Sequence, residues 1–130
     1  MIRIDLDDPR PLEDQLASEL RLAVARGEVG PGDELPSARQ LAGDLGVHWN
    51  TVARVYRRLD DEGLIAVRHG RKATVTRRTP PAAAAPAARA SLRAQLVDAM
   101  TVGRLRGLTP RDLADVFKEA LQQLQEKKSP

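Results

Sequence analysis

The segment from Ser37 to Gly63 constrains the fold most, because it holds two helical patterns of unequal length separated by one glycine. Ser37 is a favourable N-cap for the shorter helix. Its apolar face consists of Leu41, Ala42 and Leu45. Gly46 stands where a glycine takes the left-handed conformation that ends a helix. The longer helix, over residues 49–62, carries apolar residues at offsets of 0, 3, 4 and 7: Val52, Val55, Tyr56 and Leu59. Two helices joined by so short a turn predict a helix-turn-helix.

The flanking segments complete a recognisable order of elements. Apolar residues at helical spacing predict a first helix over residues 12–26, and the alternation over residues 2–6 predicts a short strand. After Gly63, two β-prone runs surround a short basic loop, which predicts a hairpin over residues 64–76. Helix, short helix, glycine turn, helix and basic-tipped hairpin is the order of a winged helix-turn-helix. We therefore expect an α+β fold over residues 1–78.

Beyond that domain the composition changes twice. Residues 79–87 are rich in proline and alanine, which is typical of a semi-stiff linker. Residues 88–130 predict two amphipathic helices, the second beginning at Thr109 as N-cap with Pro110 in its first turn. Their apolar stripes are Leu92, Leu96 and Met100 on the first helix, and Leu113, Val116, Phe117, Leu121 and Leu124 on the second. Because two such helices cannot cover each other's stripes completely, they need a partner.

Composition and charge limit the class of protein. The chain has no cysteine, which excludes disulfides and thiolate metal sites, and it has no run of about 18 apolar residues that could span a membrane. We expect a cytoplasmic protein. The net charge is −5 over residues 1–49, +5 over residues 50–78 and +3 over residues 79–130. Basic charge concentrated around the longer helix and the hairpin suits a polyanionic partner.

The candidate DNA-binding residues follow from this arrangement. On the longer helix, Asn50, Arg54 and Arg57 lie opposite the apolar face, where arginine can pair with guanine and asparagine with adenine. The full predicted set is Ser37, Arg39, His48, Trp49, Asn50, Thr51, Arg54, Arg57, His69, Gly70, Arg71 and Lys72. Trp49, the chain's only tryptophan, has two interpretations that the sequence leaves open: an indole that packs at the core edge, or one that contacts DNA.

An enzyme is poorly supported. His48 and His69 are the only histidines, and no phosphate-binding glycine loop, paired catalytic carboxylates or nucleophile elbow is present. We expect no cofactor and no metal. Two other classes stay open on sequence alone: a winged helix used for docking to another protein, and a nucleic-acid binder without sequence preference.

The spaced motifs resemble one family in particular. They are Gly32-Asp33-x-Leu35-Pro36-Ser37-x-Arg39-x-Leu41-Ala42, Leu45-Gly46-Val47, Asn50-Thr51-Val52, Arg57-Arg58-Leu59 and Glu62-Gly63-Leu64. Together they resemble the DNA-binding domain of GntR-family bacterial transcription regulators, over about residues 2–76. The Ile4-Asp5 opening, the string from Asn50 to Tyr56 and the short tail are most similar to the YtrA-like branch.

The resemblance implies a winged-helix homodimer that binds a palindromic operator, usually as a repressor. In the YtrA-like branch it implies that the helical hairpin over residues 88–130 serves dimerisation. It implies that Arg39, Trp49, Asn50, Thr51 and Gly70 approach DNA and that, in the YtrA-like branch, Arg54 joins them. Many members carry arginine in place of Trp49 and of Ala53, so the family's usual operator bases do not transfer to this chain. About 40 residues after the linker are too few to enclose an ordinary ligand pocket. Any small-molecule effector, as yet unknown, would bind at the dimer interface or between domains.

Overall fold

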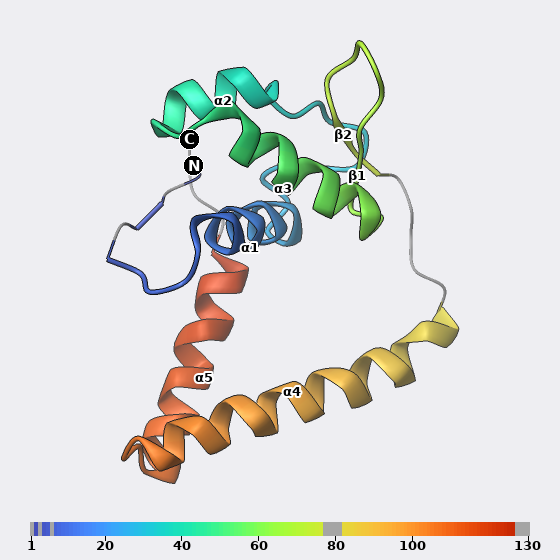
Figure 1. Ribbon diagram of the computed structural model, residues 1–130. Helices are drawn as coiled ribbons and strands as arrows, with labels where there is room; N and C mark the ends of the chain where they lie inside the picture. Colours follow the sequence, from blue (N-terminus) through green and yellow to red (C-terminus); the bar gives the residue numbers. More distant parts are fainter. Residues whose placement is uncertain (1, 3, 6, 77–81, 127–130) are drawn as a thin grey trace. The chain divides into compact units, whose positions relative to one another are not determined.

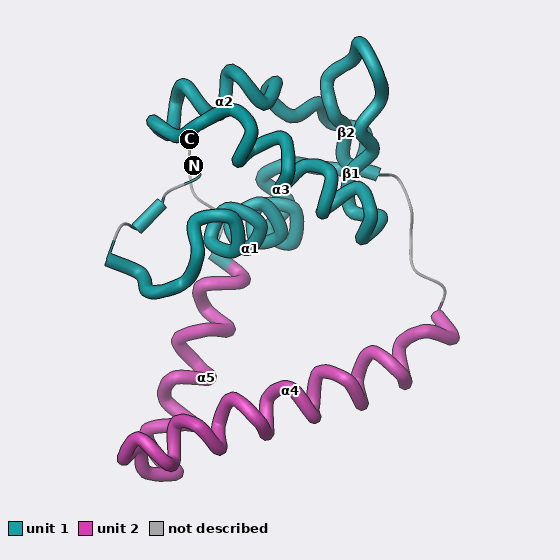
Figure 2. Tube along the Cα trace, viewed as in Figure 1, with its two compact units in different colours: residues 1–78, 126–130 teal, residues 79–125 magenta. Residues whose placement is uncertain are grey.

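The computed structural model describes residues 2, 4, 5, 7–76 and 82–126. The chain divides into two compact units, residues 1–78 with 126–130 and residues 79–125 (Figure 2). Each unit has its own elements and is described by itself.

The first unit contains three helices and a small sheet (Figure 1). The helices are α1 (Leu12–Ala25), α2 (Ala38–Leu45) and α3 (Trp49–Asp61). The strands β1 (Ile65–Ala66) and β2 (Thr74–Val75) pair antiparallel, with Ile65 opposite Val75 and Ala66 opposite Thr74. This element order is the predicted helix-turn-helix followed by a hairpin wing. The winged-helix part of the predicted α+β fold is therefore confirmed.

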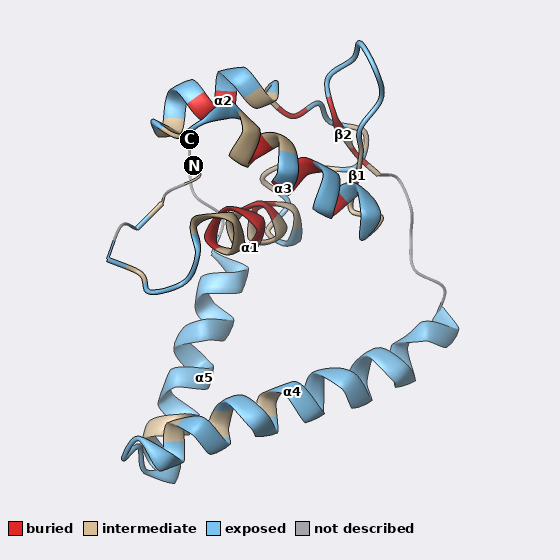
Figure 3. Cartoon of the chain, in the orientation of Figure 1, coloured by how far each residue is buried: buried red, intermediate tan, exposed pale blue. Residues whose placement is uncertain are grey.

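The apolar side chains of this unit meet in one core between α1, α2, α3 and the hairpin (Figure 3). The largest fully buried side chains are Leu16, Val52, Val55, Leu59 and Ile65. Three of them lie on the apolar face predicted for α3. Burial of such aliphatic side chains contributes about 1.5–3 kcal/mol each and holds the outward face of α3 in a fixed orientation.

Local contacts explain where α2 and α3 begin and end. The Ser37 hydroxyl accepts a hydrogen bond of 3.1 Å from the Gln40 amide, so Ser37 is the N-cap of α2 as predicted. Gly46 ends α2 with a φ of 72°, in the left-handed region that glycine tolerates best. The His48 ring then caps α3, because its Nδ1 accepts 3.1 Å from the Asn50 amide. A histidine cap was not predicted.

The base of the wing is bonded to the segment that leads into α2. The amide of Leu35 donates to the Ala73 carbonyl at 2.8 Å, and the amide of Val75 donates to the Asp33 carbonyl at 2.9 Å. A single β-bridge between Glu34 and Thr74 lies between these bonds. The segment of residues 33–35 is thus bonded to the hairpin as a third backbone segment beside its two short strands.

Some predicted bounds differ from the structure. No strand includes Ile2, Ile4 or Asp5, while residues 3 and 6 of the predicted strand lie outside the described residues. The reason is visible at Asp5, whose amide donates to the Gln15 side chain at 3.2 Å instead of to a neighbouring strand. The first helix ends at Ala25, and the two strands of the hairpin are shorter than the β-prone runs.

The regular elements described in the second unit are all helices. A short 3-10 helix, η1 (Ala82–Ala84), runs directly into α4 (Ala85–Leu105), and α5 (Pro110–Gln125) follows after a turn. Residues 82–87 are therefore helical, where the sequence predicted a linker over residues 79–87. Alanine is the strongest helix former, and Pro86 lies in the first turn of α4, where its missing N–H is not needed. Residues 79–81 of the predicted linker lie outside the described residues.

The turn between α4 and α5 is well defined. The Thr109 hydroxyl accepts 3.1 Å from the Asp112 amide, and the Asp112 carboxylate accepts 2.8 Å from the Thr109 amide. This reciprocal capping box starts α5 at the predicted position. These bonds also hold the pKa of Asp112 below its usual value, chiefly through the bond from the Thr109 backbone.

The predicted apolar stripes of this unit are largely uncovered (Figure 3). Among the described residues of α4 and α5 none is buried. The exposed members of the stripes are Leu92, Val116, Phe117, Leu121 and Leu124, while Leu96, Met100 and Leu113 are half-buried. Leu105, outside the predicted set, is 82% exposed. A single copy of this unit therefore leaves many large apolar side chains exposed to water.

Candidate nucleic-acid interface

The polar face of α3 points away from the core. Arg54 and Arg57 are exposed and Asn50 is half-buried, whereas Val52 and Val55 on the other side are fully buried. The structure thus places these three predicted side chains on one outward face. An exposed helical face that carries arginine and asparagine has the donors needed to read base edges in a major groove.

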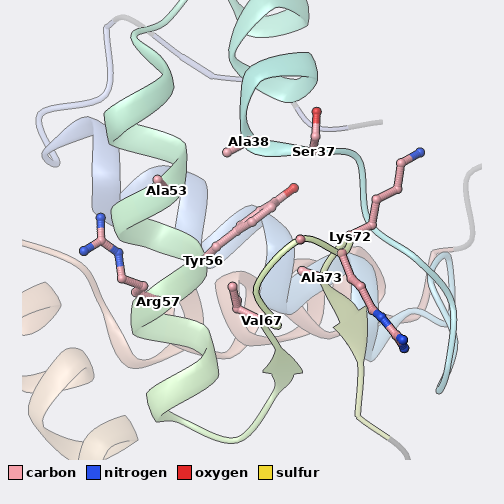
Figure 4. A pocket seen from close by; sticks show the side chains of 10 residues that line it. Ser37, Ala38, Ala53, Tyr56, Arg57, Val67, Lys72 and Ala73 are labelled. Carbon is pink, nitrogen blue, oxygen red and sulfur yellow. The ribbon is translucent and has the colours of Figure 1, made fainter.

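An open groove of about 470 Å³ lies between this face, the N-terminus of α2 and the wing (Figure 4). Five of the predicted DNA-binding residues line it, together with Tyr56 and several apolar residues. The full lining is Ser37, Ala38, Ala53, Tyr56, Arg57, Val67, Gly70, Arg71, Lys72 and Ala73. Arg57 lines it from α3, and Arg71 and Lys72 line it from the wing. The groove is therefore bordered by cations on two of its sides.

Tyr56 joins the floor of the groove to α2 (Figure 4). Its hydroxyl donates a hydrogen bond of 2.7 Å to the Pro36 carbonyl, immediately before the N-cap of α2. Burial raises the pKa of Tyr56 to about 12, so the hydroxyl keeps its proton at neutral pH. This bond fixes the spacing between α3 and the α2 N-terminus, the two elements that a helix-turn-helix presents to DNA.

Trp49 lies on the surface rather than in the core. The indole is 39% exposed and is absent from the hydrophobic cluster and from the partly buried residues packed against it. The Arg39 guanidinium carbon stands 4.7 Å from the indole centroid, a cation–π contact. The ring of His48, the N-cap of α3, stacks on the indole at 6.0 Å between centroids. These contacts place the indole at the surface, against Arg39 and His48.

Arg54 has a partner that the sequence did not predict. Its Nε donates to Oε1 of Glu13 on α1 at 2.5 Å. One helical turn further along α3, Nη1 of Arg58 donates to Oδ1 of Asp14 at 2.7 Å. The acidic residues in the first turn of α1 were the one sequence signal for these ion pairs, but nothing in the sequence shows that this turn lies close to α3.

The wing tip is open to solvent. His69, Gly70, Arg71 and Lys72 are all exposed, and Gly70 has a φ of 72° with no atom within 4 Å of an added Cβ. A glycine in the left-handed conformation with free space around it allows close approach to a ligand backbone. Arg71 and Lys72 also border a second open groove, which Arg68 lines as well. Arg68 was not among the predicted residues.

The remaining predicted residues surround the same face. Ser37 and Arg39 are exposed at the start of α2, and Thr51 is half-buried in the first turn of α3. The structure therefore brings five predicted residues together in one groove and places Arg39 against Trp49.

Two other kinds of site receive no support from the described part of the chain. Over residues 2–126, excluding those left undescribed, no helix has the length and apolar character to cross a membrane. Within the same residues no three histidine, aspartate or glutamate side chains gather as metal ligands would.

Comparison with known proteins agrees with this geometry. Residues 12–75 match the model of the family described as bacterial regulatory proteins, gntR family. The HTH-type transcriptional regulator Rv1152 of Mycobacterium tuberculosis is 40% identical over 111 residues, which cover 85% of this chain and 86% of that protein. The chain belongs to the GntR family. It is a DNA-binding transcription regulator of that family, and its relatives are regulators rather than enzymes.

Two further relatives agree with the resemblance to the YtrA-like branch. The HTH-type transcriptional repressor YtrA of Bacillus subtilis is 37% identical over 71 residues. These residues span 55% of this chain and 55% of that protein. The solved structure of YtrA from Sulfolobus acidocaldarius, a GntR-family transcription factor, is 37% identical, with a TM-score of 0.62. That match covers 77% of this chain and 97% of the other. The winged-helix fold of this GntR regulator is thereby shared with a solved relative.

Proposed function

We propose that this GntR regulator is a dimeric repressor that binds a palindromic operator through α3 and the wing. The single observation that carries the proposal is the groove in which the outward face of α3, the α2 N-terminus and the basic wing meet. This arrangement has the size and charge of a surface that receives a DNA backbone and an adjoining groove.

Each element has a separate role in this proposal. Asn50, Arg54 and Arg57 of α3 read base edges in the major groove, with Trp49 and Thr51 in the first turn beside them. At the start of α2, Ser37 and Arg39 hold a phosphate. On the wing, His69 and Gly70 enter the minor groove, and Arg71 and Lys72 bind phosphates.

Dimerisation is supported by the uncovered stripes of α4 and α5. Phe117 is 47% exposed and Leu121 is 41% exposed in a single copy, although such side chains are normally buried. A second copy that covers the stripes would also bring two winged units to the two halves of a palindrome. Repression is supported by the name of the Bacillus subtilis relative, the transcriptional repressor YtrA.

The enclosed pocket described in the first unit is smaller than an ordinary effector site. The enclosed pocket beside α1, lined by Leu20, Val24, Leu35 and other apolar residues, has a volume of about 70 Å³. Ordinary ligand pockets are larger, about 300–1,000 Å³.

The proposal is tested by titrating the protein with duplex from upstream of its own gene and with a scrambled duplex, at two salt concentrations. Fluorescence anisotropy reports binding, and Trp49 emission reports whether the indole is at the interface. We expect tight, salt-dependent binding to the upstream duplex alone, with a changed emission. Equal affinity for both duplexes would indicate a non-specific binder, and binding to neither would redirect the search to selected sequences from a random library.

A further inference from the structure

Two arginines of α3 face α1, and they are bonded in different ways. Arg58 donates through a terminal nitrogen, Nη1, to Asp14. Arg54 donates through its inner nitrogen, Nε, to Glu13. Within the described residues, both terminal amino groups of Arg54 have no bonding partner. The two guanidinium groups therefore offer different edges to a ligand.

The free edge of Arg54 is the one that base recognition uses. Guanine presents O6 and N7 side by side in the major groove, and the two terminal amino groups of an arginine donate to them together. A carboxylate at Nε leaves this edge available and fixes the plane of the guanidinium. It also lowers the rotamer entropy that the side chain loses when it binds a base.

The environment of the pair suits such a role. The Arg54 side chain is 54% exposed and the Glu13 side chain is 40% exposed, so the pair stands at the surface on the outward face of α3. Exposed ion pairs contribute little to folding stability. Arg58, in contrast, has its Nη1 at Asp14 and its Nε 4.0 Å from Glu62, so carboxylates occupy both sides of its guanidinium.

We propose that Glu13 is a positioning residue that presents the terminal edge of Arg54 to a guanine of the operator. The inference rests on the proposed function, because it requires α3 to read a sequence in the major groove. It also specifies one nucleobase that the protein reads: each half-site contains a guanine whose N7 accepts a hydrogen bond from Arg54.

The test starts with selection of binding sequences from a random duplex library by the full-length protein. Each guanine of the selected site is then replaced by 7-deazaguanine, which lacks the N7 acceptor. For the parent we expect one guanine per half-site at which this replacement weakens binding about tenfold. Arg54→Ala should show no penalty there. Glu13→Gln should reduce the penalty to about threefold, because Arg54 keeps its donors but loses its orientation.

Asp14→Asn is the matched control. It removes the same charge one residue away and frees Arg58 instead of Arg54. Both neutral variants should raise the affinity for a scrambled duplex by a similar factor of about two, since each removes one negative charge near the phosphates. Only Glu13→Gln should change the penalty for 7-deazaguanine, and both should keep the thermal unfolding midpoint of the parent.

Three results would overturn the inference. The first is a Glu13→Gln variant that loses as much affinity on 7-deazaguanine replacement as the parent does. The second is an Asp14→Asn variant whose penalty for 7-deazaguanine falls as far as that of Glu13→Gln, because the effect would then come from charge alone. The third is a parent that selects a sequence but tolerates 7-deazaguanine everywhere, in which case the proposed function stands without a guanine contact. A parent that selects no sequence overturns the proposed function as well.

Discussion

The two units of this chain differ in how far they bury their apolar side chains. In the winged unit, Leu16, Val52 and Leu59 are fully buried among three helices and a hairpin. In the α4–α5 unit the described residues include none that is buried, and Phe117 and Leu124 face solvent. Both units have helices with clear apolar stripes, so amphipathic sequence alone does not make a closed core. A third packed element is what the winged unit has and the other lacks.

The difference separates two kinds of stability. The winged unit should unfold with a free energy that is independent of protein concentration, because its core is complete within one chain. The stability of α4 and α5 should depend on concentration if a second copy covers them. The predictions that follow test this contrast from the largest expected effect to the smallest.

Leu59→Ala should lower the free energy of unfolding of the winged unit by about 2–5 kcal/mol, because it removes fully buried methyl groups and leaves a cavity. Chemical denaturation followed by circular dichroism measures the change. A loss below about 1 kcal/mol would mean that the core around α3 is much looser than the burial of Leu59 indicates.

Phe117→Asp should weaken self-association at least tenfold while leaving the winged unit folded, since a charge on the uncovered stripe opposes burial against a second copy. Sedimentation equilibrium over a range of concentrations measures this effect. Lys118→Asp is a control that introduces the same side chain at the neighbouring position, outside the predicted stripe. Equal weakening by both variants would argue against the α5 stripe as the dimer interface.

Tyr56 should make the winged unit less stable as the pH rises from about 10 to about 12. Burial raises the pKa of Tyr56 to about 12, against a usual value of 10.0. Below both values the hydroxyl is protonated in the folded and unfolded states alike. Between them the unfolded chain ionises first, so the free energy of unfolding falls. Because the chain has one tyrosine, phenolate absorbance measures this titration directly, and ionisation near 10 in the folded protein would contradict it.

Ser37→Ala should cost about 1 kcal/mol of unfolding free energy, because α2 loses the acceptor for the Gln40 amide. Denaturation midpoints measure the loss. Ser37→Asp should recover most of it, since aspartate is also a good N-cap. A Ser37→Asp variant as unstable as Ser37→Ala would mean that the hydroxyl matters for a reason other than capping.

The smallest expected effect is a loss of helix content at low pH, caused by weakening of the capping box that starts α5. The pKa of Asp112 is lowered by its bonds to Thr109, so its contribution is present at neutral pH and is lost as the pH falls through that lowered value. Helix content followed between neutral pH and strong acid should decline less in Asp112→Asn than in the parent. Identical acid profiles would show that the capping box contributes nothing measurable.

The sequence predicted most of the elements, because their signals are local. The periodicity of α3, the Ser37 cap, the Gly46 terminus and the Thr109 capping box each depend on residues within a few positions of one another. The strand over residues 2–6 was wrong at its described residues, because alternation does not reveal whether a partner edge exists. The predicted linker differs from the structure, in which residues 82–87 are helical. The reason is that the tendency of its alanines to form a helix outweighed the tendency of its prolines to keep the chain extended.

The outward residues of the candidate site were also predictable, while their partners were not. The helical wheel places Arg54 and Asn50 opposite the core, but the contact between Arg54 and Glu13 joins residues 41 positions apart. The stacking of Arg39 over Trp49 likewise depends on the angle between α2 and α3. Such contacts follow from the packing of the whole unit, which no short sequence window contains.

The backbone bonds at the base of the wing have a consequence for motion. Since Leu35 donates to Ala73 and Val75 donates to Asp33, the wing base and the lead-in to α2 share one ladder. Opening either partner breaks the same bonds. In native-state hydrogen exchange, the amides of Leu35 and Val75 should therefore exchange at a common rate, as one cooperative unit. We expect faster exchange only at the exposed tip of the wing, from His69 to Lys72.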